Sequence, residues 1–471
     1  MPLSLGEQQR FTNPLLDLDV PDPDAIALST GGFALVASSF DREPGLPLWH
    51  SDDLMTWRPV GFAGGHRPDA PHDGGVWAPS IREHDGRLYL TWGDPDLGVF
   101  VTESEHLAGP WSEPRLVLAG RGLIDPCPYW DETGRAWIVH GYARSRAGFA
   151  NRIDVFEVDR RLSLPLSGSR TVIDGDRIPG CSVLEGPKIY SRDGELWIFA
   201  PAGGVATGWQ YAFRAPSWAG PWEHRIVLDQ GSTPVNGPHQ GAWVVGADGE
   251  EWFLHFQAKG ALGRVLHLQP LSWAEDGWPL IGDPETPGAP VASWPTPRGG
   301  TTMPPPSPAG DGFAADELSA AWHTRGAGRS ALVPVVGGGR IRLAGHPDGA
   351  LLRPLDGAHR TIEVRVLRTD GAAAAFVVSD ARVRELRLDP EGRTAIVTHE
   401  PDGIRTEHLT DSAAGARLGL RVQGTEAAFT LDGEALGEPF LLEGRRWTGT
   451  EWGLAARGDG TVTFGPVEVS A

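Results

Sequence analysis

The stretch CSVLEGPKIYSRDGELWIFAP, residues 181–201, carries both a fold signal and a chemical question. Asp193-Gly194 is a dipeptide typical of a tight hairpin turn, and the run after it is rich in strand-forming residues. Glu185 lies nine residues before Gly194, within a short apolar run. A buried carboxylate is unfavourable unless it is paired or put to use. Glu185 therefore has either a structural partner or a role as a functional acid.

The same hairpin signal recurs along the chain as a glycine-centred turn followed by a short strand. Successive turn glycines are 55, 48, 60 and 55 residues apart. A period of about fifty residues with several short strands is typical of a β-propeller. A weaker repeat places tryptophans in DLMTWRPV (53–60), AGPWSEP (108–114) and AGPWEHR (219–225). The repeats predict five blades, with turn glycines at Gly31, Gly86, Gly134, Gly194 and Gly249.

Length and composition predict an all-β protein of two domains. The chain has 471 residues, including 63 glycines, 41 prolines and 19 tryptophans. This length exceeds that of one ordinary core. We predict a five-bladed β-propeller over 1–290, a Pro/Gly-rich linker over 291–311 and a β-sandwich over 312–471, where short strands alternate with turns.

The five hairpins share one register. Counting back nine residues from each turn glycine gives Asp22, Trp77, Asp125, Glu185 and Gln240. If the blades are equivalent, these residues occupy one position on the innermost strand and converge on the central axis. The register predicts a pocket with three carboxylates. Two alternatives remain open, since such acids can bind water or ions in the channel and the spacing can match by chance.

Three carboxylates around one pocket suit hydrolysis of a glycosidic bond. One carboxyl group protonates the leaving oxygen, and an ionised one activates water. Glu185 has the setting of the acid, because its apolar strand and a neighbouring carboxylate disfavour its charged form. Asp22 lies among prolines in VPDPDAI, which fix the backbone of a base. Asp125 can tune Glu185, and Asp24 is the alternative to Asp22, one strand alternation further on.

Four blocks resemble, in order, the motifs of glycoside hydrolase family 43: VPDPDAI, GGVWAPSIREHDGRLYLTW, LIDPCPYWDETGRAWIVHG and LEGPKIYSRDGELWIFAPAGG. The resemblance covers residues 13–282 and implies a five-bladed propeller that acts by inversion. It implies that Asp22 is the general base and Glu185 the general acid. Asp125 would modulate the pKa of the acid and orient the substrate. These are the three acids that the register selects.

Further blocks resemble the branch in which α-L-arabinofuranosidases and β-D-xylosidases predominate: GYARSRAGFANRIDVFEV, NGPHQGAW, EEWFLHFQ and GRVLHLQPLSW. The resemblance implies that Trp77 lines the sugar pocket and that Arg264 contacts the sugar. It places His239 near the axis, where family members hold a water or a calcium ion. The structural alternatives are that Trp77 is a core tryptophan, that Arg264 forms a surface ion pair and that His239 is a hydrogen-bonded core histidine.

Three more residues complete the predicted substrate-binding set. Phe40 and Trp209 are candidates for the rim of the pocket, and Gln240 follows from the hairpin register. The C-terminal β-sandwich has few aromatic residues in its strands, which favours a structural role for it over independent sugar binding.

The sequence predicts an exo-acting, inverting glycosidase that releases terminal α-L-arabinofuranosyl units from plant-derived oligosaccharides. A β-D-xylosidase, or an enzyme with both activities, is the alternative, and a non-catalytic sugar-binding propeller is the alternative of another class. Inversion requires the carboxyls of Asp22 and Glu185 to lie roughly 6.5–9.5 Å apart. We expect no required cofactor, with a structural Ca²⁺ on the axis as the one candidate ion.

Charge and cysteine content limit the possible partners of the protein and its cellular compartment. The net charge of −20 argues against nucleic acid and anionic membranes as partners. The two cysteines form no disulfide framework, and the first residues lack a basic region followed by a long apolar one. We therefore expect a cytoplasmic protein.

Overall fold

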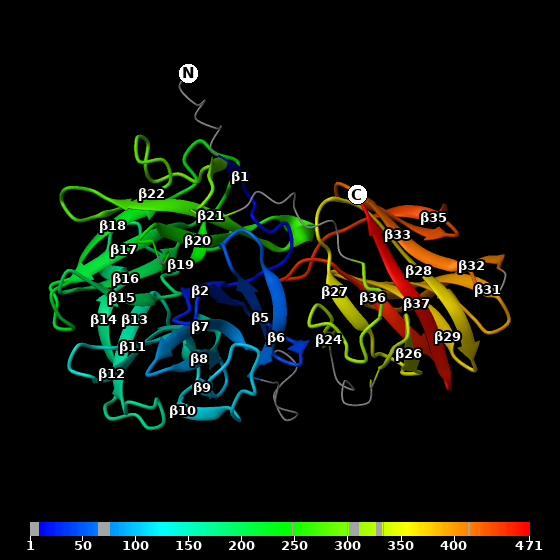
Figure 1. The fold of residues 1–471 in the computed structure, drawn as a ribbon, viewed down its shortest axis with the longest axis horizontal. Coiled ribbons are helices and arrows are strands. Elements are labelled where there is room, and N and C mark those ends of the chain that lie inside the picture. The colour runs from blue at the N-terminus through cyan, green and yellow to red at the C-terminus, as the bar shows by residue number, and fades with distance from the viewer. Residues whose placement is uncertain are drawn as a thin grey trace, which may run out of the picture. The chain divides into compact units, whose positions relative to one another are not determined.

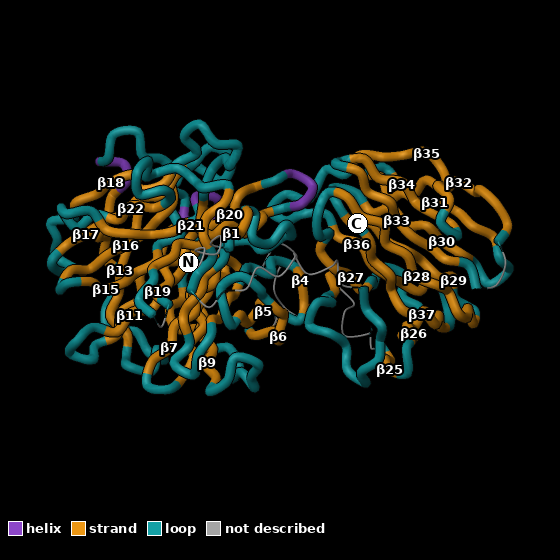
Figure 2. Tube along the Cα trace, turned by 45° about the horizontal axis from the view of Figure 1, so that its top comes forward, coloured by secondary structure: helices purple, strands orange, loops and turns teal. Residues whose placement is uncertain are grey.

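The computed structural model describes residues 9–64, 76–246, 248–298, 300, 310–325, 332, 334–412 and 415–471. The regular structure of these residues is almost entirely strand, joined by loops and turns (Figure 2), with one short α-helix, α1 (Arg144–Ala147). The all-β prediction is confirmed. No helix in the described ranges is long and apolar enough to cross a membrane.

The chain divides into two compact units. The first comprises Met1–Leu16, Val20–Ala258 and Val265–Met303, and the second comprises Asp17–Asp19, Lys259–Arg264 and Pro304–Ala471. The change of unit near Met303 falls within the predicted linker, 291–311. Much of that linker lies outside the described residues.

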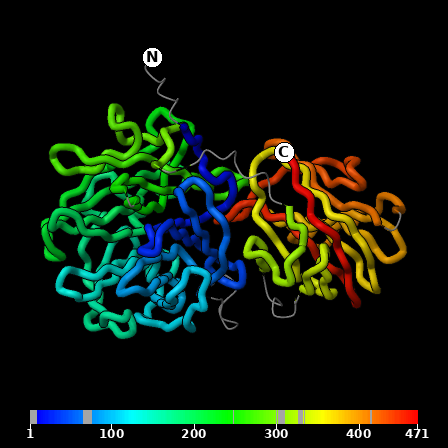
Figure 3. The backbone as a smooth tube through the Cα atoms, viewed as in Figure 1, coloured from blue at the N-terminus to red at the C-terminus, as the bar shows by residue number. Residues whose placement is uncertain are grey.

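Five four-stranded sheets follow one another along the first unit (Figure 1). Figure 3 shows the chain passing through them in order, from blue through cyan to green. Each is built from strands that are near neighbours in the sequence. The strands are β2 (Asp24–Ala27), β3 (Phe33–Val36), β5 (Leu46–Ser51) and β6 (Arg58–Ala63); β7 (Trp77–His84), β8 (Arg87–Asp94), β9 (Gly98–Ser104) and β10 (Arg115–Ala119); β11 (Leu123–Trp130), β12 (Ala136–Tyr142), β13 (Arg152–Val158) and β14 (Arg170–Asp174); β15 (Lys188–Arg192), β16 (Glu195–Ala202), β17 (Trp209–Ala215) and β18 (Glu223–Leu228); and β19 (His239–Val245), β20 (Glu251–Ala258), β21 (Arg264–Trp273) and β22 (Pro279–Ile281).

Each predicted turn glycine lies in the turn between the first and second strands of its sheet. All five have positive φ, between 71° and 96°. A Cβ at four of them would meet nothing within 4 Å, and at Gly134 it would meet only the Arg160 guanidinium, at 3.7 Å, in ordinary contact. The backbone conformation, not lack of space, therefore requires glycine. Asp85 and Asp193 also have positive φ, of 50° and 52°. Two successive residues with positive φ make the turn whose twist matches that of the strands.

The hydrophobic core of the first unit lies between adjacent sheets. Side chains of the first and second sheets share one cluster, those of the second and third share another, and the pattern continues through the fifth sheet. The first strands of the sheets are also neighbours, since β2 contacts β7, β7 contacts β11 and β11 contacts β15. The last sheet meets the first, because β19 contacts β2.

Residues before the first sheet pair with residues after the fifth. β1 (Arg10–Thr12) forms a two-stranded sheet with β23 (Ser293–Pro295), which lies inside the predicted linker. Asn13 donates its side-chain amide to the carbonyls of Leu268 and Val291, at 2.8 and 2.9 Å. The two ends of the first unit are therefore tied to each other.

The second unit holds two larger sheets. The seven-stranded sheet has the order β25 (Val335–Gly337), β26 (Arg340–Ala344), β37 (Thr461–Ser470), β28 (His359–Asp370), β33 (Arg417–Gln423), β34 (Glu426–Leu431) and β35 (Glu434–Leu441). The six-stranded sheet has the order β27 (Leu351–Pro354), β36 (Glu451–Arg457), β29 (Ala373–Ser379), β30 (Val383–Leu388), β31 (Arg393–Glu400) and β32 (Gly403–Asp411).

Candidate active site

In each of the five four-stranded sheets, a residue with positive φ lies within two residues of the start of the first strand. These residues are Asp22, Ala78, Asp125, Gly186 and Gln240, with φ of 51°, 35°, 58°, 58° and 42°. Irregular pairing accompanies three of them, in β7, β11 and β19. Non-glycine residues held in this region are strained, and such strain concentrates at functional sites. The five positions thus mark one end of the five sheets as the candidate site.

The hairpin register finds three of these positions and misses two by one residue. Asp22, Asp125 and Gln240 are the residues that the nine-residue count selects. In the second and fourth sheets the positive φ falls on Ala78 and Gly186, directly after Trp77 and Glu185. All five sheets therefore have a residue with positive φ near this position. In two of them, the side chain that the register selects, Trp77 or Glu185, belongs to the residue just before it.

Asp125 lies at the centre of the carboxylate cluster. Its side chain is buried, and its Oδ2 accepts hydrogen bonds from the Gly186 N–H at 2.7 Å and the Gln240 side-chain amide at 3.4 Å. Burial, followed by the negative charges of Glu185 and Asp22, raises the pKa of Asp125 to about 8. Glu185 and Asp22 thus both lie close enough to Asp125 to act on it electrostatically.

The raised pKa of Asp125 predicts a pH-dependent stability. The folded chain holds this proton more tightly than the unfolded chain, in which the pKa is near 3.8. The stabilising contribution of the proton is complete below pH 3.8 and is lost as the pH rises to about 8. We expect the melting temperature of wild type to fall relative to that of Asp125→Asn across this interval, measured by calorimetry. Parallel curves for the two proteins would contradict the assignment.

Glu185 is held by a histidine. The Nε2 atom of His239 lies 2.9 Å from Oε1 of Glu185. The His239 side chain is almost fully buried, whereas a quarter of the Glu185 side chain is exposed. The Glu185 backbone N–H donates to the Pro201 carbonyl at 3.1 Å. Glu185 therefore has a structural partner and is partly exposed, and its role as a functional acid stays a prediction.

Asp22 is held by a serine that bridges two sheets. Ser38 donates its hydroxyl to Oδ2 of Asp22 at 2.6 Å, and the same hydroxyl accepts the Ala78 N–H at 2.7 Å. The Asp22 side chain is buried. Its carboxylate is therefore fixed in place beside the start of β7, as a base that must orient a water requires.

Asp24, the alternative base, belongs to a separate buried ion-pair cluster. Its Oδ2 accepts from Arg82 at 2.7 Å and from the Ile81 N–H at 2.9 Å. Lys188, which the sequence reasoning missed, lies 4.0 Å from it. The alternation argument that placed Asp24 on the side of Asp22 fails, because Asp22 has positive φ and β2 begins only at Asp24. Asp22 is thus the better candidate.

Lys188 is fully buried in the strand that follows Glu185. Its ammonium donates to the Pro79 carbonyl and to the Ser80 hydroxyl, each at 2.8 Å. The reasoning that singled out Glu185, a charge within an apolar stretch, applies equally to this lysine three residues later. Its positive charge lowers the pKa of Asp125 and so opposes the larger effect of burial.

The predicted substrate-binding residues occupy different surroundings. The rings of Phe40 and Trp77 meet edge to face at 6.1 Å. Trp209 begins β17 and meets Tyr211 edge-on, also at 6.1 Å. Arg264 begins β21 in the part assigned to the second unit, and its backbone N–H donates to Asp19. The sugar-binding roles of Phe40, Trp77, Trp209 and Arg264 stay predictions.

The predicted calcium site finds no cage of protein ligands in the described part of the chain. Calcium prefers six to eight oxygen ligands. The described residues include no group of three or more His, Cys, Asp and Glu side chains that could hold a metal. The Nε2 atom of His239 is engaged with Glu185. These residues therefore offer no cage of such side chains around an ion, and a Ca²⁺ near His239 stays a prediction.

Comparison with known proteins identifies relatives over the first unit. The family model described as "Glycosyl hydrolases family 43" matches residues 11–279. A protein of Xylanibacter ruminicola named "Putative beta-xylosidase" is 41% identical over 285 residues, which are 59% of this chain and 52% of that protein. A "Non-reducing end alpha-L-arabinofuranosidase" of Bacteroides ovatus is 30% identical over 58% of this chain and 54% of its own length. The matches thus span about half the length of these two relatives.

Two comparisons cover nearly the whole chain. A "Beta-xylosidase" of Formosa agariphila is 26% identical over 95% of this chain and 88% of its own length. Among solved structures, a xylan beta-1,4-xylosidase from Bacillus halodurans has a TM-score of 0.80 at 20% identity, covering 98% of this chain and 100% of that one. At 20% identity, this similarity shows a shared fold alone.

Proposed function

Because the chain belongs to the glycosyl hydrolases family 43, we propose that it is an exo-acting glycosidase that removes terminal pentosyl units with inversion. The observation that carries this proposal is the cluster of three carboxyls, in which Glu185 and Asp22 both raise the pKa of Asp125. A non-catalytic sugar-binding protein has no need of three acids brought together in this way.

Each acid has one task in the proposed reaction. Asp22, fixed by Ser38, takes a proton from a water that attacks the anomeric carbon. Glu185 gives its proton to the leaving oxygen as the glycosidic bond breaks. Asp125, whose pKa both other acids raise, orients the substrate between them. One attack by water inverts the anomeric configuration.

We propose further that the five sheets are the blades of a propeller and that the two sheets of the second unit form a sandwich. The shared clusters between successive sheets support the first assignment, as does the contact of β19 with β2. The likeness in fold to solved structures of the family supports both. In this arrangement the strained starts of the inner strands surround the axis.

For the substrate, we propose terminal β-D-xylosyl units first and α-L-arabinofuranosyl units second. The Xylanibacter ruminicola and Formosa agariphila relatives are named xylosidases, and the Bacteroides ovatus relative is named an arabinofuranosidase. The arabinofuranoside preference expected from sequence has no specific support in these names. Either sugar fits the same acid–base arrangement.

Hydrolysis of two aryl glycosides tests the proposal. We expect release of the aryl group from aryl β-D-xylopyranoside, from aryl α-L-arabinofuranoside, or from both. Proton NMR of the first sugar formed should show the inverted anomer before it equilibrates. A product of retained configuration would refute the roles given to Asp22 and Glu185, and absence of cleavage of both glycosides would refute the pentosidase assignment.

A further inference from the structure

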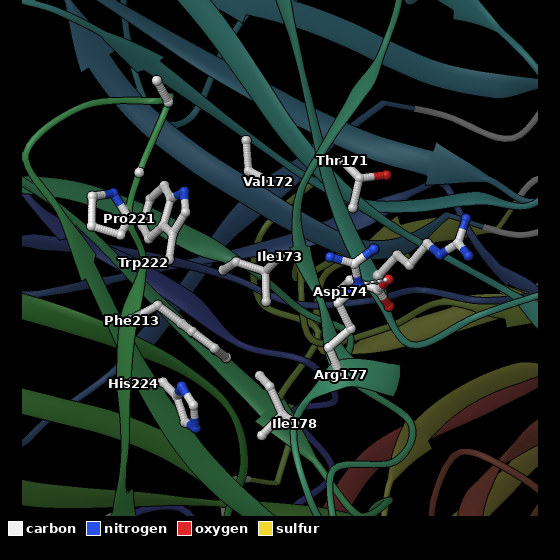
Figure 4. Close-up of a pocket in the computed structure, with 13 residues that line it drawn as sticks. Thr171, Val172, Ile173, Asp174, Arg177, Ile178, Phe213, Pro221, Trp222 and His224 are labelled. Atoms are coloured by element: carbon white, nitrogen blue, oxygen red, sulfur yellow. Dashed lines mark ion pairs between the residues drawn. The ribbon is translucent and has the colours of Figure 1, made fainter.

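Glu185 lies on a segment that no sheet holds. Residues 175–187, all of which the structure describes, connect β14 to β15 and belong to no strand. Arg177 and Ile178 of this segment line part of a pocket of about 610 Å³ (Figure 4). Most of residues 176–183 are exposed, namely Asp176, Arg177, Pro179, Gly180, Ser182 and Val183. Since much of the segment faces solvent or the pocket, its hydrogen bonds largely decide where Glu185 lies.

The buried side chain of Asn151 makes several of these hydrogen bonds. Asn151 directly precedes β13 of the third sheet. Its Oδ1 accepts the N–H of Leu184, the residue before Glu185, at 2.9 Å. Its Nδ2 donates to Oδ1 of Asp176 at 2.8 Å and to the Cys181 carbonyl at 3.3 Å. One amide group, which can donate and accept at once, therefore holds the segment at three points.

The backbone of Asn151 holds the beginning of the same segment. Its carbonyl accepts the Gly175 N–H at 2.8 Å. A Cβ added at Gly175 would lie 2.7 Å from Oδ1 of Asn151, so the two residues are in close contact. Asn151 has φ of 65°, in the left-handed region that asparagine tolerates better than most residues. Asn151 thus ties together both ends of the stretch that leads to Glu185.

The other hydrogen bonds of Glu185 come from different sheets. Its backbone N–H donates to the carbonyl of Pro201, on β16 of the fourth sheet. Its carboxylate contacts His239, on β19 of the fifth sheet, at 2.9 Å. Asn151 adds a hold from the third sheet. A general acid must lie within about 2.6–3.2 Å of the atom that it protonates, and a misplacement of about 1 Å can cost about 10²-fold in rate.

We propose that Asn151 is a positioning residue for the general acid, which sets where the Glu185 carboxyl lies relative to the leaving oxygen. This inference rests on the proposed function, in which Glu185 protonates that oxygen. Loss of the Asn151 amide should then slow a substrate in proportion to its need for protonation. A residue that only stabilises the fold would lower stability and leave the dependence on the leaving group unchanged.

A series of aryl glycosides whose phenols differ in acidity tests the inference. Asn151→Gly allows the left-handed backbone and removes the amide. We expect its kcat to fall by about 10²-fold for the least acidic phenols and to stay near that of wild type for the most acidic. A plot of log kcat against phenol acidity should therefore be steeper for Asn151→Gly than for wild type.

An exchange of partners supplies the rescue. Asn151→Asp places a second carboxylate against Asp176 and removes the donor, so its plot should also be steeper than that of wild type. The double variant Asn151→Asp/Asp176→Asn swaps the two groups and restores a donor and an acceptor to this contact. Its plot should return towards that of wild type.

Asn13→Ala is the matched control. The Asn13 side chain makes three hydrogen bonds to the backbone of Leu268 and Val291, outside the segment that carries Glu185. This variant should lower the melting temperature and leave the plot unchanged.

Each result has a definite meaning. A steeper plot for Asn151→Gly that the double variant reverses and Asn13→Ala does not share supports the inference. If Asn151→Gly does not fold, Asn151→Asp and the double variant make the same test. An unchanged plot in the folded Asn151 variants, no reversal in the double variant, or an equal change in Asn13→Ala overturns it. Wild type that cleaves no aryl glycoside refutes the proposed function and this inference together, whereas cleavage with an unchanged plot refutes the inference alone.

Discussion

Glu185→Gln lowers kcat for a short xylo-oligosaccharide by about 10²- to 10⁴-fold, the usual contribution of a general acid. The amide cannot donate a proton to the leaving oxygen, although it can still hydrogen-bond to Nε2 of His239, which lies 2.9 Å from the carboxylate. The fold should therefore persist while the proton transfer is lost. Steady-state kinetics on the oligosaccharide and a melting curve measure the two properties separately.

The leaving group provides an internal check on this loss. An aryl group with an acidic phenol leaves without much protonation, so Glu185→Gln should retain far more activity on such a substrate. Glu195→Gln is a matched control, because Glu195 opposes Arg192 at the tip of the same hairpin. It should behave like wild type on both substrates. An equal loss on aryl and natural glycosides would show that Glu185 is not the proton donor.

Asp22→Asn and Asp24→Asn should fail in different ways. Asp22→Asn removes the base, and we expect kcat to fall by about 10²- to 10⁴-fold whatever the leaving group, with little change in stability. Asp24→Asn removes the partner of the buried Arg82 guanidinium. Leaving a buried charge uncompensated lowers the free energy of unfolding by about 3–5 kcal/mol.

Urea denaturation and kinetics on both variants measure this contrast. Added azide should restore turnover to Asp22→Asn, because a small anionic nucleophile needs no base to activate it. Azide should have no such effect on Asp24→Asn. If Asp24→Asn loses turnover while its stability is unchanged, the assignment of the base to Asp22 is wrong.

The fold could be predicted from sequence where local chemistry dictates it. A turn with positive φ at both central residues accepts few residue types, so Asp85-Gly86 and Asp193-Gly194 predict their hairpins from sequence. The strands that follow carry the side chains of the clusters between sheets, and their apolar runs show in the sequence. The pairing of β1 with β23 has no such local signal, because it depends on where distant segments come together.

The candidate site could be predicted from sequence only as far as the count of nine residues back from each turn glycine applies. The count of nine residues found Asp22 and Asp125, whose positive φ the sequence does not announce. It could not anticipate that in two sheets the residue with positive φ is Ala78 or Gly186, one position after the residue that the count selects. The ion pairs of Asp24 could not be predicted either, because Arg82 and Lys188 belong to other sheets.

The pairing of β1 with β23 also bears on how the protein folds. Arg10 and Ser293, which hydrogen-bond to each other, are 283 positions apart in the chain. Contacts of such sequence separation close a very long loop and slow the search for the native state. During synthesis the first strand emerges long before its partner, so it must wait unpaired while the five sheets assemble. Its docking is then a late event, and the same pairing resists the separation of the first and last sheets once it has formed.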